Sequence, residues 1–370
     1  MIFDQSEIDR TGPRFLASLR ERGYTETPSA PLTAADRSVT FVNASITPFK
    51  PRLLAGDAIG RTCQVQQCLR ATGRAPWLYV FGMLGVLADG TYLEDVIDHA
   101  PQALLAAAPW LAAERLAIAV DRDHDDLRAY LEKSTLLKEA PVREVRHEEV
   151  PTRWSYGKDG RLTGRGITFF HREDVADCGP ECAIGCRCGR WRELGQVIEV
   201  SSPNARYAEA GFGLEPLQSI ALGGNPYALP AVRALTDRLR EVGVPEDAAP
   251  QAANLLRAVT ALVEEDVQPG GKGGANVMRR FLRELLGLLG AADSPDDEWR
   301  ERVHRAVRDE RVADALLAEG ERWRTAHVAA RAAARAHLRR RPETPAHVLA
   351  ETFGVPMEQA RQMCLEATRP

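Results

Sequence analysis

The sequence lacks several features that mark particular classes of protein. Its 370 residues contain no apolar run approaching the ~18–20 residues that span a bilayer, and MIFDQSEIDR at the N-terminus does not have the pattern of a signal peptide. Only five of the 48 basic residues are lysine, and aromatic residues make up 6% of the chain. A net charge of −4 argues against nonspecific coating of nucleic acid. We therefore expect a cytoplasmic protein without a membrane partner, with room for two or three domains of roughly 100–200 residues.

Cysteine is sparse but unevenly distributed. Four of the seven cysteines lie within eleven residues, namely Cys178, Cys182, Cys186 and Cys188. In a cytosolic chain such thiols stay reduced, and the spacing C-x3-C-x3-C-x-C suits a tight knuckle around one tetrahedral Zn²⁺. We predict a structural zinc without a catalytic role, because four thiolates leave no open position. The alternative is a reduced, glycine-rich loop without metal.

The apolar pattern changes near residue 235. Before it, strand-like runs occur in SVTFVNA, WLYVFGML, RLAIAVD, GITFF and GQVIEV. Helices and turns separate these runs without strict alternation, which predicts an α+β fold with an antiparallel-rich sheet. After it, apolar residues recur at three- and four-residue spacing, which predicts an all-helical domain. The expected helices cover 231–243, 250–266, 275–290, 295–319, 321–340 and 345–367.

Several segments, in order, resemble the alanyl-tRNA synthetases, a class II family. TFVNASITPFKPRLL (40–54) resembles the first class II motif, RTCQVQQCLRATG (61–73) and VFGMLGVLADGTY (80–92) resemble the second-motif region, and GLEPLQSIALGGNPY (213–227) resembles the third. More closely, the chain resembles a short subgroup that carries a four-cysteine insertion, here 178–188. The resemblance implies a class II antiparallel-sheet catalytic domain (1–235) and a helical tRNA-recognition domain (236–370), without the family's editing and C-terminal domains.

The resemblance also implies a reaction and a set of site residues. ATP, with Mg²⁺, and alanine or a small analogue would form an adenylate, and the aminoacyl group would pass to tRNA or another acceptor. Arg70 matches the arginine that the family places on the α-phosphate, and Phe81 is expected to bind ATP as well. Arg74, in the shortened loop after Arg70, is expected to bind ATP as a replacement for one of the family's groups that this sequence lacks. The amino-acid site implied by the family comprises Trp154, Gln196, Glu209, Gly211 and Gly213; for Trp154 the alternative is an ordinary core tryptophan.

Other positions depart from the family pattern. Gly82 stands where the second motif has a glutamate, and Pro216 where the third motif has an arginine. Gly271 and Gly274 replace the asparagine and arginine associated with reading the tRNA acceptor stem. These departures keep a second hypothesis open, a catalytically degenerate paralogue that binds tRNA, aminoacyl-tRNA or a partner protein. A third hypothesis, a small zinc-binding regulatory protein, would explain the four cysteines but no other feature of the sequence.

One segment of the helical half is strongly basic. From Arg322 to Arg341 there are seven arginines and no acidic residue. His327, Arg331, Arg335 and Arg339 recur every four residues, which predicts a stripe on one helix face able to neutralise RNA phosphates. A solvated helix face is the alternative. Glu351 joins the expected RNA contacts through the resemblance, and the amino acid, the acceptor and the oligomeric state stay open.

Overall fold

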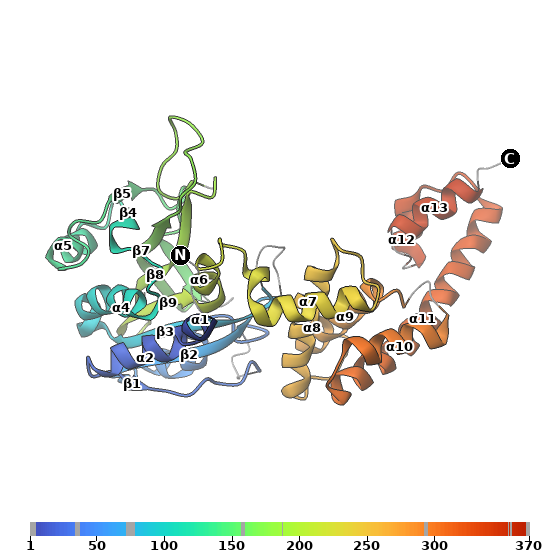
Figure 1. Ribbon diagram of the computed structural model, residues 1–370, viewed down its shortest axis with the longest axis horizontal. Coiled ribbons are helices and arrows are strands. Elements are labelled where there is room, and N and C mark those ends of the chain that lie inside the picture. The colour runs from blue at the N-terminus through green and yellow to red at the C-terminus, as the bar shows by residue number, and fades with distance from the viewer. Residues whose placement is uncertain are drawn as a thin grey trace. The chain divides into compact units, whose positions relative to one another are not determined.

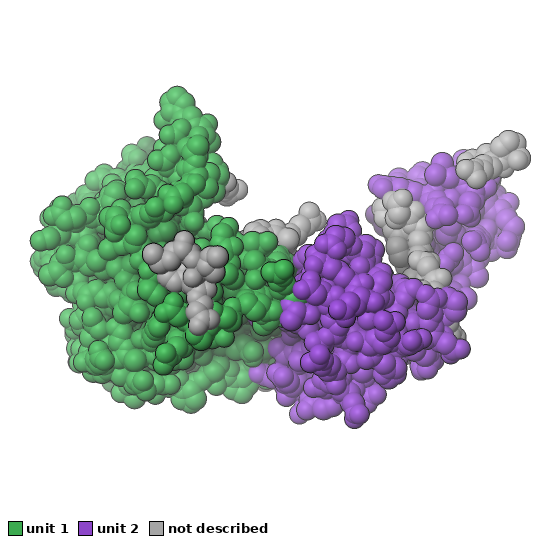
Figure 2. Space-filling model, viewed as in Figure 1, with its two compact units in different colours: residues 1–233 green, residues 234–370 purple. Residues whose placement is uncertain are grey.

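The computed structural model divides into two compact units, Met1–Arg233 and Ala234–Pro370 (Figure 2). The division falls beside residue 235, at which the apolar pattern changes. The residues described are 5–33, 38–71, 78–156, 160–186, 188–291, 295–353, 355 and 357–367.

The described part of the first unit contains one mixed sheet of nine strands (Figure 1). The strands are β1 (Thr25–Glu26), β2 (Arg61–Leu69), β3 (Val80–Asp89), β4 (Leu116–Asp121), β5 (Val142–Val145), β6 (Arg153–Tyr156), β7 (Leu162–Arg172), β8 (Trp191–Ser201) and β9 (Arg206–Gly213). Their order is β1-β2-β3-β9-β8-β7-β4-β5, and β6 pairs with β7. The β1–β2 and β4–β5 pairs are parallel and the others antiparallel, so the predicted α+β class with an antiparallel-rich sheet is confirmed.

The two longest helices of this unit cover one face of the sheet, and a short helix packs against part of the other face, beside the site. The helices of the unit are α1 (Gln5–Asp9), α2 (Thr11–Arg20), α3 (Lys50–Ala55), α4 (Leu93–Ala107), α5 (Asp125–Lys133) and α6 (Leu214–Ile220), with single 3-10 turns at Thr47–Phe49, Gly90–Tyr92, Ala113–Arg115 and Pro226–Ala228. Alternate residues of β3, Leu84 and Val86, join the main core with residues of α2 and α4. Side chains alternate along a strand, so Met83 and Leu87 contribute to separate clusters on the opposite face.

The expected strand SVTFVNA is wrong. Residues 38–44 form turns and irregular chain ahead of α3. The backbone N–H of Val42 donates to Leu32 O at 2.8 Å, and the Leu69 N–H donates to Val42 O at 2.8 Å. Phe41 and Val42 are nevertheless buried, because Val42 packs against Cys68 of β2. The apolar run therefore indicates burial without a continuous strand ladder.

The second unit is helical in its described residues, as expected. Its helices are α7 (Pro230–Glu241, across the division), α8 (Ala249–Glu264), α9 (Gly273–Leu288), α10 (Asp296–Ala306), α11 (Glu310–Arg340), α12 (Ala346–Phe353) and α13 (Met357–Ala367). None of the described helices is long and apolar enough to cross a bilayer.

Two expected helix boundaries in this unit are wrong. The predicted break at residue 320 lies inside α11, and the chain breaks earlier, at Asp309, whose side chain caps α11 by accepting the Arg311 N–H at 2.8 Å. Gly320 marks a packing site: a Cβ there would lie 2.5 Å from Cη2 of the buried Trp299. The predicted helix 345–367 is divided into α12 and α13.

Candidate functional site

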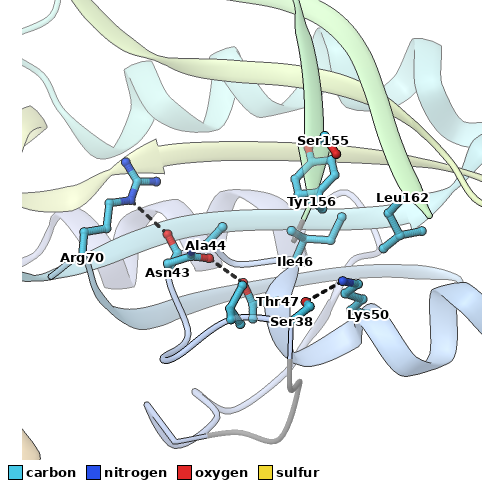
Figure 3. Close-up of a pocket in the computed structure, with 11 residues that line it drawn as sticks. Ser38, Asn43, Ala44, Ile46, Thr47, Lys50, Arg70, Ser155, Tyr156 and Leu162 are labelled. Atoms are coloured by element: carbon cyan, nitrogen blue, oxygen red, sulfur yellow. Dashed lines mark hydrogen bonds between the residues drawn. The ribbon is translucent and has the colours of Figure 1, made fainter. Parts of the chain in front are cut away.

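Two cavities lie beside the sheet face opposite α2 and α4, and Arg70 lines both. The larger, about 300 Å³, is bordered by the ends of β2, β3, β8 and β9. The smaller, about 200 Å³, lies between the 38–50 segment and the end of β6 (Figure 3). A cation shared by two neighbouring cavities can contact ligands in both.

Arg70 directly follows β2 and is held on two sides. Its backbone N–H donates to Tyr79 O at 2.9 Å, and its side-chain Nε donates to Asn43 O at 3.1 Å (Figure 3). The guanidinium carbon lies 5.1 Å from the centre of the Phe81 ring, within the range of a cation–π contact. The side chain is exposed, so its charge is positioned without being buried.

The wall of the larger cavity depends on glycines. Gly211 and Gly213 on β9 line it together with Gln196 and Pro216. Gly195 has φ +155°, and a Cβ there would lie 2.1 Å from Gly211 O, so a side chain is excluded. A Cβ at Gly213 would lie 2.9 Å from Pro216 Cγ. The bare backbone keeps this side of the cavity open.

Glu193 adds a carboxylate to the larger cavity. It is the one carboxylate among the described residues that line the cavity. Nε2 of Gln196 donates to its Oε1, and its exposed position leaves it accessible to a ligand.

The departure at Gly82 has a packing explanation. A Cβ at Gly82 would lie 2.9 Å from Leu214 Cδ2, on the side of the strand away from Phe81 and Met83. The Gly82 N–H donates to Oε2 of Glu215 at 2.7 Å. Leu214 thus occupies the space that a glutamate side chain at position 82 would need. The carboxylate of Glu215, in the segment that resembles the third motif, is instead held against β3.

Glu209 is a buried carboxylate on the site face of β9. Its side chain is 4% exposed and does not line either cavity in the described part of the chain. The Tyr156 hydroxyl donates to Oε2 at 2.5 Å, and the Ser45 hydroxyl donates to Oε1 at 3.3 Å. Burial raises the pKa of Glu209 to about 7, against the opposing effects of the hydrogen bonds from Tyr156, Ser45 and the Ile46 backbone and of the positive charge of Arg70.

Apart from Arg70, the residues that line the smaller cavity were not predicted from the sequence. Its polar lining includes Asn43, Thr47, Lys50 and Tyr156, and Nζ of the buried Lys50 donates to Ser38 Oγ at 2.6 Å (Figure 3). Asn43, Thr47 and Lys50 lie in the 40–54 segment that carries the family resemblance, whereas Tyr156 lies outside the segments that carry it. They were not singled out because sequence alone does not show which side chains line a cavity.

Trp154 and Arg74 are two predicted site residues that are not among the described residues lining a cavity. Trp154 is absent from the described lining of both cavities and packs against the buried cluster that includes Ile46, Leu53 and Leu87. Arg74 lies outside the described residues.

The four-cysteine segment forms a compact candidate metal centre between β7 and β8, in a loop that projects from the sheet (Figure 1). The Sγ atoms of Cys178, Cys182, Cys186 and Cys188 all lie within 4.8 Å of one another. The pairs Cys178–Cys186 and Cys182–Cys188 are 3.5 and 3.7 Å apart. Zn–S bonds of about 2.3 Å place tetrahedral thiolates about 3.8 Å apart, so the four sulfurs fit a zinc ion.

The predicted basic stripe is only partly exposed. Arg335 and Arg339 are exposed on α11, and Arg331 is half-buried. His327 does not belong to the exposed stripe: it is 5% exposed, and its ring centre lies 5.7 Å from that of Trp323. The predicted exposure is wrong for His327 because residues spaced four apart shift gradually around α11, from its packed side at His327 to its solvent-exposed side at Arg335 and Arg339. Glu351 is exposed on α12.

Comparison with known proteins identifies the class. Residues 12–178 match the family model for class II (A) tRNA synthetases, so the chain carries a class II tRNA-synthetase domain. The chain is 30% identical to an alanine–tRNA ligase of Parafrankia sp. over 80% of its length, covering 36% of that ligase. It is 27% identical to the alanine–tRNA ligase of Desulforudis audaxviator over 98% of its length, covering 46% of that relative. The chain is thus a relative of the alanine–tRNA ligases and spans less than half the length of these two.

A solved structure shows a weaker likeness. An S. aureus histidyl-tRNA synthetase aligns with 66% of this chain and 79% of its own, at 12% identity and a TM-score of 0.40.

Proposed function

We propose that the first unit activates a small amino acid, alanine or an analogue, with ATP to form an aminoacyl-adenylate. The observation that carries this proposal is the position of Arg70, which lines both cavities. Adenylate formation brings an amino-acid carboxylate and the α-phosphate of ATP together. A fixed cation between the two ligands stabilises the charge that builds on the phosphate.

In this proposal ATP binds in the larger cavity. Its α-phosphate lies beside Arg70, and Phe81 lines the wall next to the guanidinium. Glu193 faces the magnesium ion that accompanies ATP. Arg74 is proposed as a second cation for the phosphates, since it follows Arg70 closely in the sequence. The backbones at Gly211 and Gly213 leave space on the opposite wall.

The amino acid binds on the side of the smaller cavity. Its carboxylate faces Arg70 and its α-ammonium faces Glu209, with Gln196 near the junction with ATP. Trp154 contributes indirectly by packing against the cluster that contains Ile46, a residue of the smaller cavity's lining. A carboxylate oxygen attacks the α-phosphorus, the bond from that phosphorus to the bridging oxygen breaks, and pyrophosphate leaves with the bond electrons.

We also propose a structural zinc on the four cysteines and an RNA surface on the second unit. Four thiolates leave no ligand position open, so the metal stabilises the projecting loop without catalysing a reaction. Residues 236–370 act as the tRNA-recognition domain, in which Arg331, Arg335 and Arg339 contact phosphates and Glu351 lies on the neighbouring α12. The acceptor is tRNA or another nucleophile.

A second candidate is a paralogue that binds tRNA, aminoacyl-tRNA or a partner protein without activating an amino acid. Pro216 favours it, since this residue lines the larger cavity and has no charge with which to hold ATP. Amino-acid-dependent exchange of pyrophosphate into ATP separates the two candidates. Activation predicts exchange with at least one small amino acid. Folded protein that shows no exchange with any amino acid in a full panel, yet binds tRNA, would establish the second candidate.

A further inference from the structure

Glu209 is enclosed by the side chains of Ser45 and Tyr156 and by the backbone of Ile46. Ser45 is fixed against the sheet, because its Cβ occupies the place of a side chain at Gly85: a Cβ there would lie 2.4 Å away. The Ser45 N–H also contacts Sδ of Met83 at 3.3 Å. The second covering group, Tyr156, is half-buried, and its hydroxyl approaches Glu209 from the side of the smaller cavity.

Tyr156 lies on a short strand at the side of the sheet, where it packs against a cluster that includes Leu162 and Ile198. It is the last residue of β6, a four-residue strand that is off the main order of the sheet and pairs with β7. Its ring rests on Gly164, where a Cβ would lie 3.3 Å from Tyr156 Cε2. The hydrogen bond from its hydroxyl to Glu209 links the tip of the Tyr156 side chain to β9, in the centre of the sheet.

We propose that Tyr156 is a gate for the amino-acid site: its hydroxyl occupies the position on Glu209 that the α-ammonium group of an amino acid takes when it binds. This inference rests on the proposed function, in which Glu209 accepts that ammonium group. The closed arrangement keeps the carboxylate away from the smaller cavity. Opening consists of the loss of the Tyr156–Glu209 hydrogen bond and a turn of the ring away from the carboxylate.

The gate has a consequence for affinity. If only a fraction of molecules has Tyr156 open, the apparent dissociation constant is the intrinsic one divided by that fraction. A hydrogen bond to a carboxylate is strong enough to keep the open fraction at about one tenth or less. Removing the hydroxyl while keeping the ring should raise the open fraction. Tyr156 is thus a positioning residue whose loss improves binding.

The first experiment measures the accessibility of Glu209 and needs no substrate. A water-soluble carbodiimide with glycine ethyl ester labels accessible carboxyl groups, and mass spectrometry reads the label on Glu209. Tyr156→Phe should increase this labelling about tenfold. Tyr24→Phe is the matched control, because its hydroxyl lies 3.3 Å from His99 Nδ1 and belongs to the main core instead. Equal labelling in Tyr156→Phe and wild type overturns the gate.

The second experiment measures the amino-acid dependence of pyrophosphate exchange, with L-alanine, glycine and L-serine as probes. Tyr156→Phe should lower KM for the accepted amino acid about tenfold, with kcat changed less than about twofold. A raised KM overturns the gate, since Tyr156 would then hold the substrate. Increased labelling without exchange in either protein supports the gate while rejecting amino-acid activation. Tyr156→Leu, a second variant without the hydroxyl, must change labelling in the same direction, and circular dichroism confirms that each variant is folded.

Discussion

Replacing Glu209 with glutamine tests whether this carboxyl group is buried in the manner described. Burial raises the pKa of Glu209 from its ordinary 4.5 to about 7. The folded protein therefore binds the proton more tightly than the unfolded chain does. The resulting stabilisation is fully present below pH 4.5 and is lost as the pH rises to about 7.

The size of the effect follows from the same pKa values. One pKa unit corresponds to 1.36 kcal/mol, so the rise from 4.5 to about 7 predicts a loss of roughly 3 kcal/mol across this pH range. Glutamine at position 209 does not titrate, and its side-chain oxygen still accepts the Tyr156 hydroxyl. Wild type should therefore lose roughly 3 kcal/mol relative to Glu209→Gln between pH 4 and 8.

Urea unfolding at a series of pH values measures this difference. The free energies of unfolding of wild type and Glu209→Gln are compared at each pH, so contributions from other titrating groups and from the helical unit cancel. Glu114→Gln, at an exposed position of the same unit, controls for the loss of one carboxylate. Curves for wild type and Glu209→Gln that run parallel from pH 4 to 8 would refute the burial of this group as an origin of pH dependence.

Three further results are expected. Gly320→Ala should destabilise the second unit by about 1–3 kcal/mol, because its Cβ would lie 2.5 Å from Trp299 Cη2. Gly287→Ala, on an exposed helix position with the nearest contact at 4.0 Å, should instead stabilise the unit by about 0.5–1 kcal/mol in the same thermal melts; an equal effect of both changes would contradict the packing. Metal analysis should find about one zinc per chain, and less than half of that in Cys182→Ser but not in Cys364→Ser; a wild-type zinc content below one half would count against the four-thiolate centre. Arg335→Glu with Arg339→Glu should weaken tRNA binding and reduce the slope of log affinity against log salt by about two, whereas unchanged binding would remove α11 as an RNA surface.

Much of the fold could be predicted because apolar periodicity reports burial directly. The antiparallel-rich sheet and the change to helices near residue 235 both follow from it. The bounds of helices and strands were harder to predict where a buried segment is not a strand, or where a glycine lies inside a helix. The 38–44 segment is apolar because it covers β2, and Gly320 looks like a helix break although it accommodates Trp299.

The site was predictable to the extent that it follows motifs. Arg70, Phe81, Gln196, Gly211 and Gly213 were selected from sequence, and all five line the larger cavity. Tyr156 was missed, although it is two residues from the selected Trp154. Spacing along a short strand does not show which of its side chains reaches a carboxylate on a distant strand. The substitution at Gly82, likewise, could be related to Leu214 only in three dimensions.

Pyrophosphate exchange by wild type and Arg70→Ala measures whether this arginine promotes adenylate formation. Arg122→Ala, an exposed arginine of the same unit, is the matched control. Loss of one group that stabilises transition-state charge typically lowers kcat by about 10²–10³. Wild type and Arg122→Ala should show amino-acid-dependent exchange, and Arg70→Ala should show a loss of about that size. Exchange that is equal in wild type and Arg70→Ala would contradict this expectation, as would the absence of exchange in folded wild type.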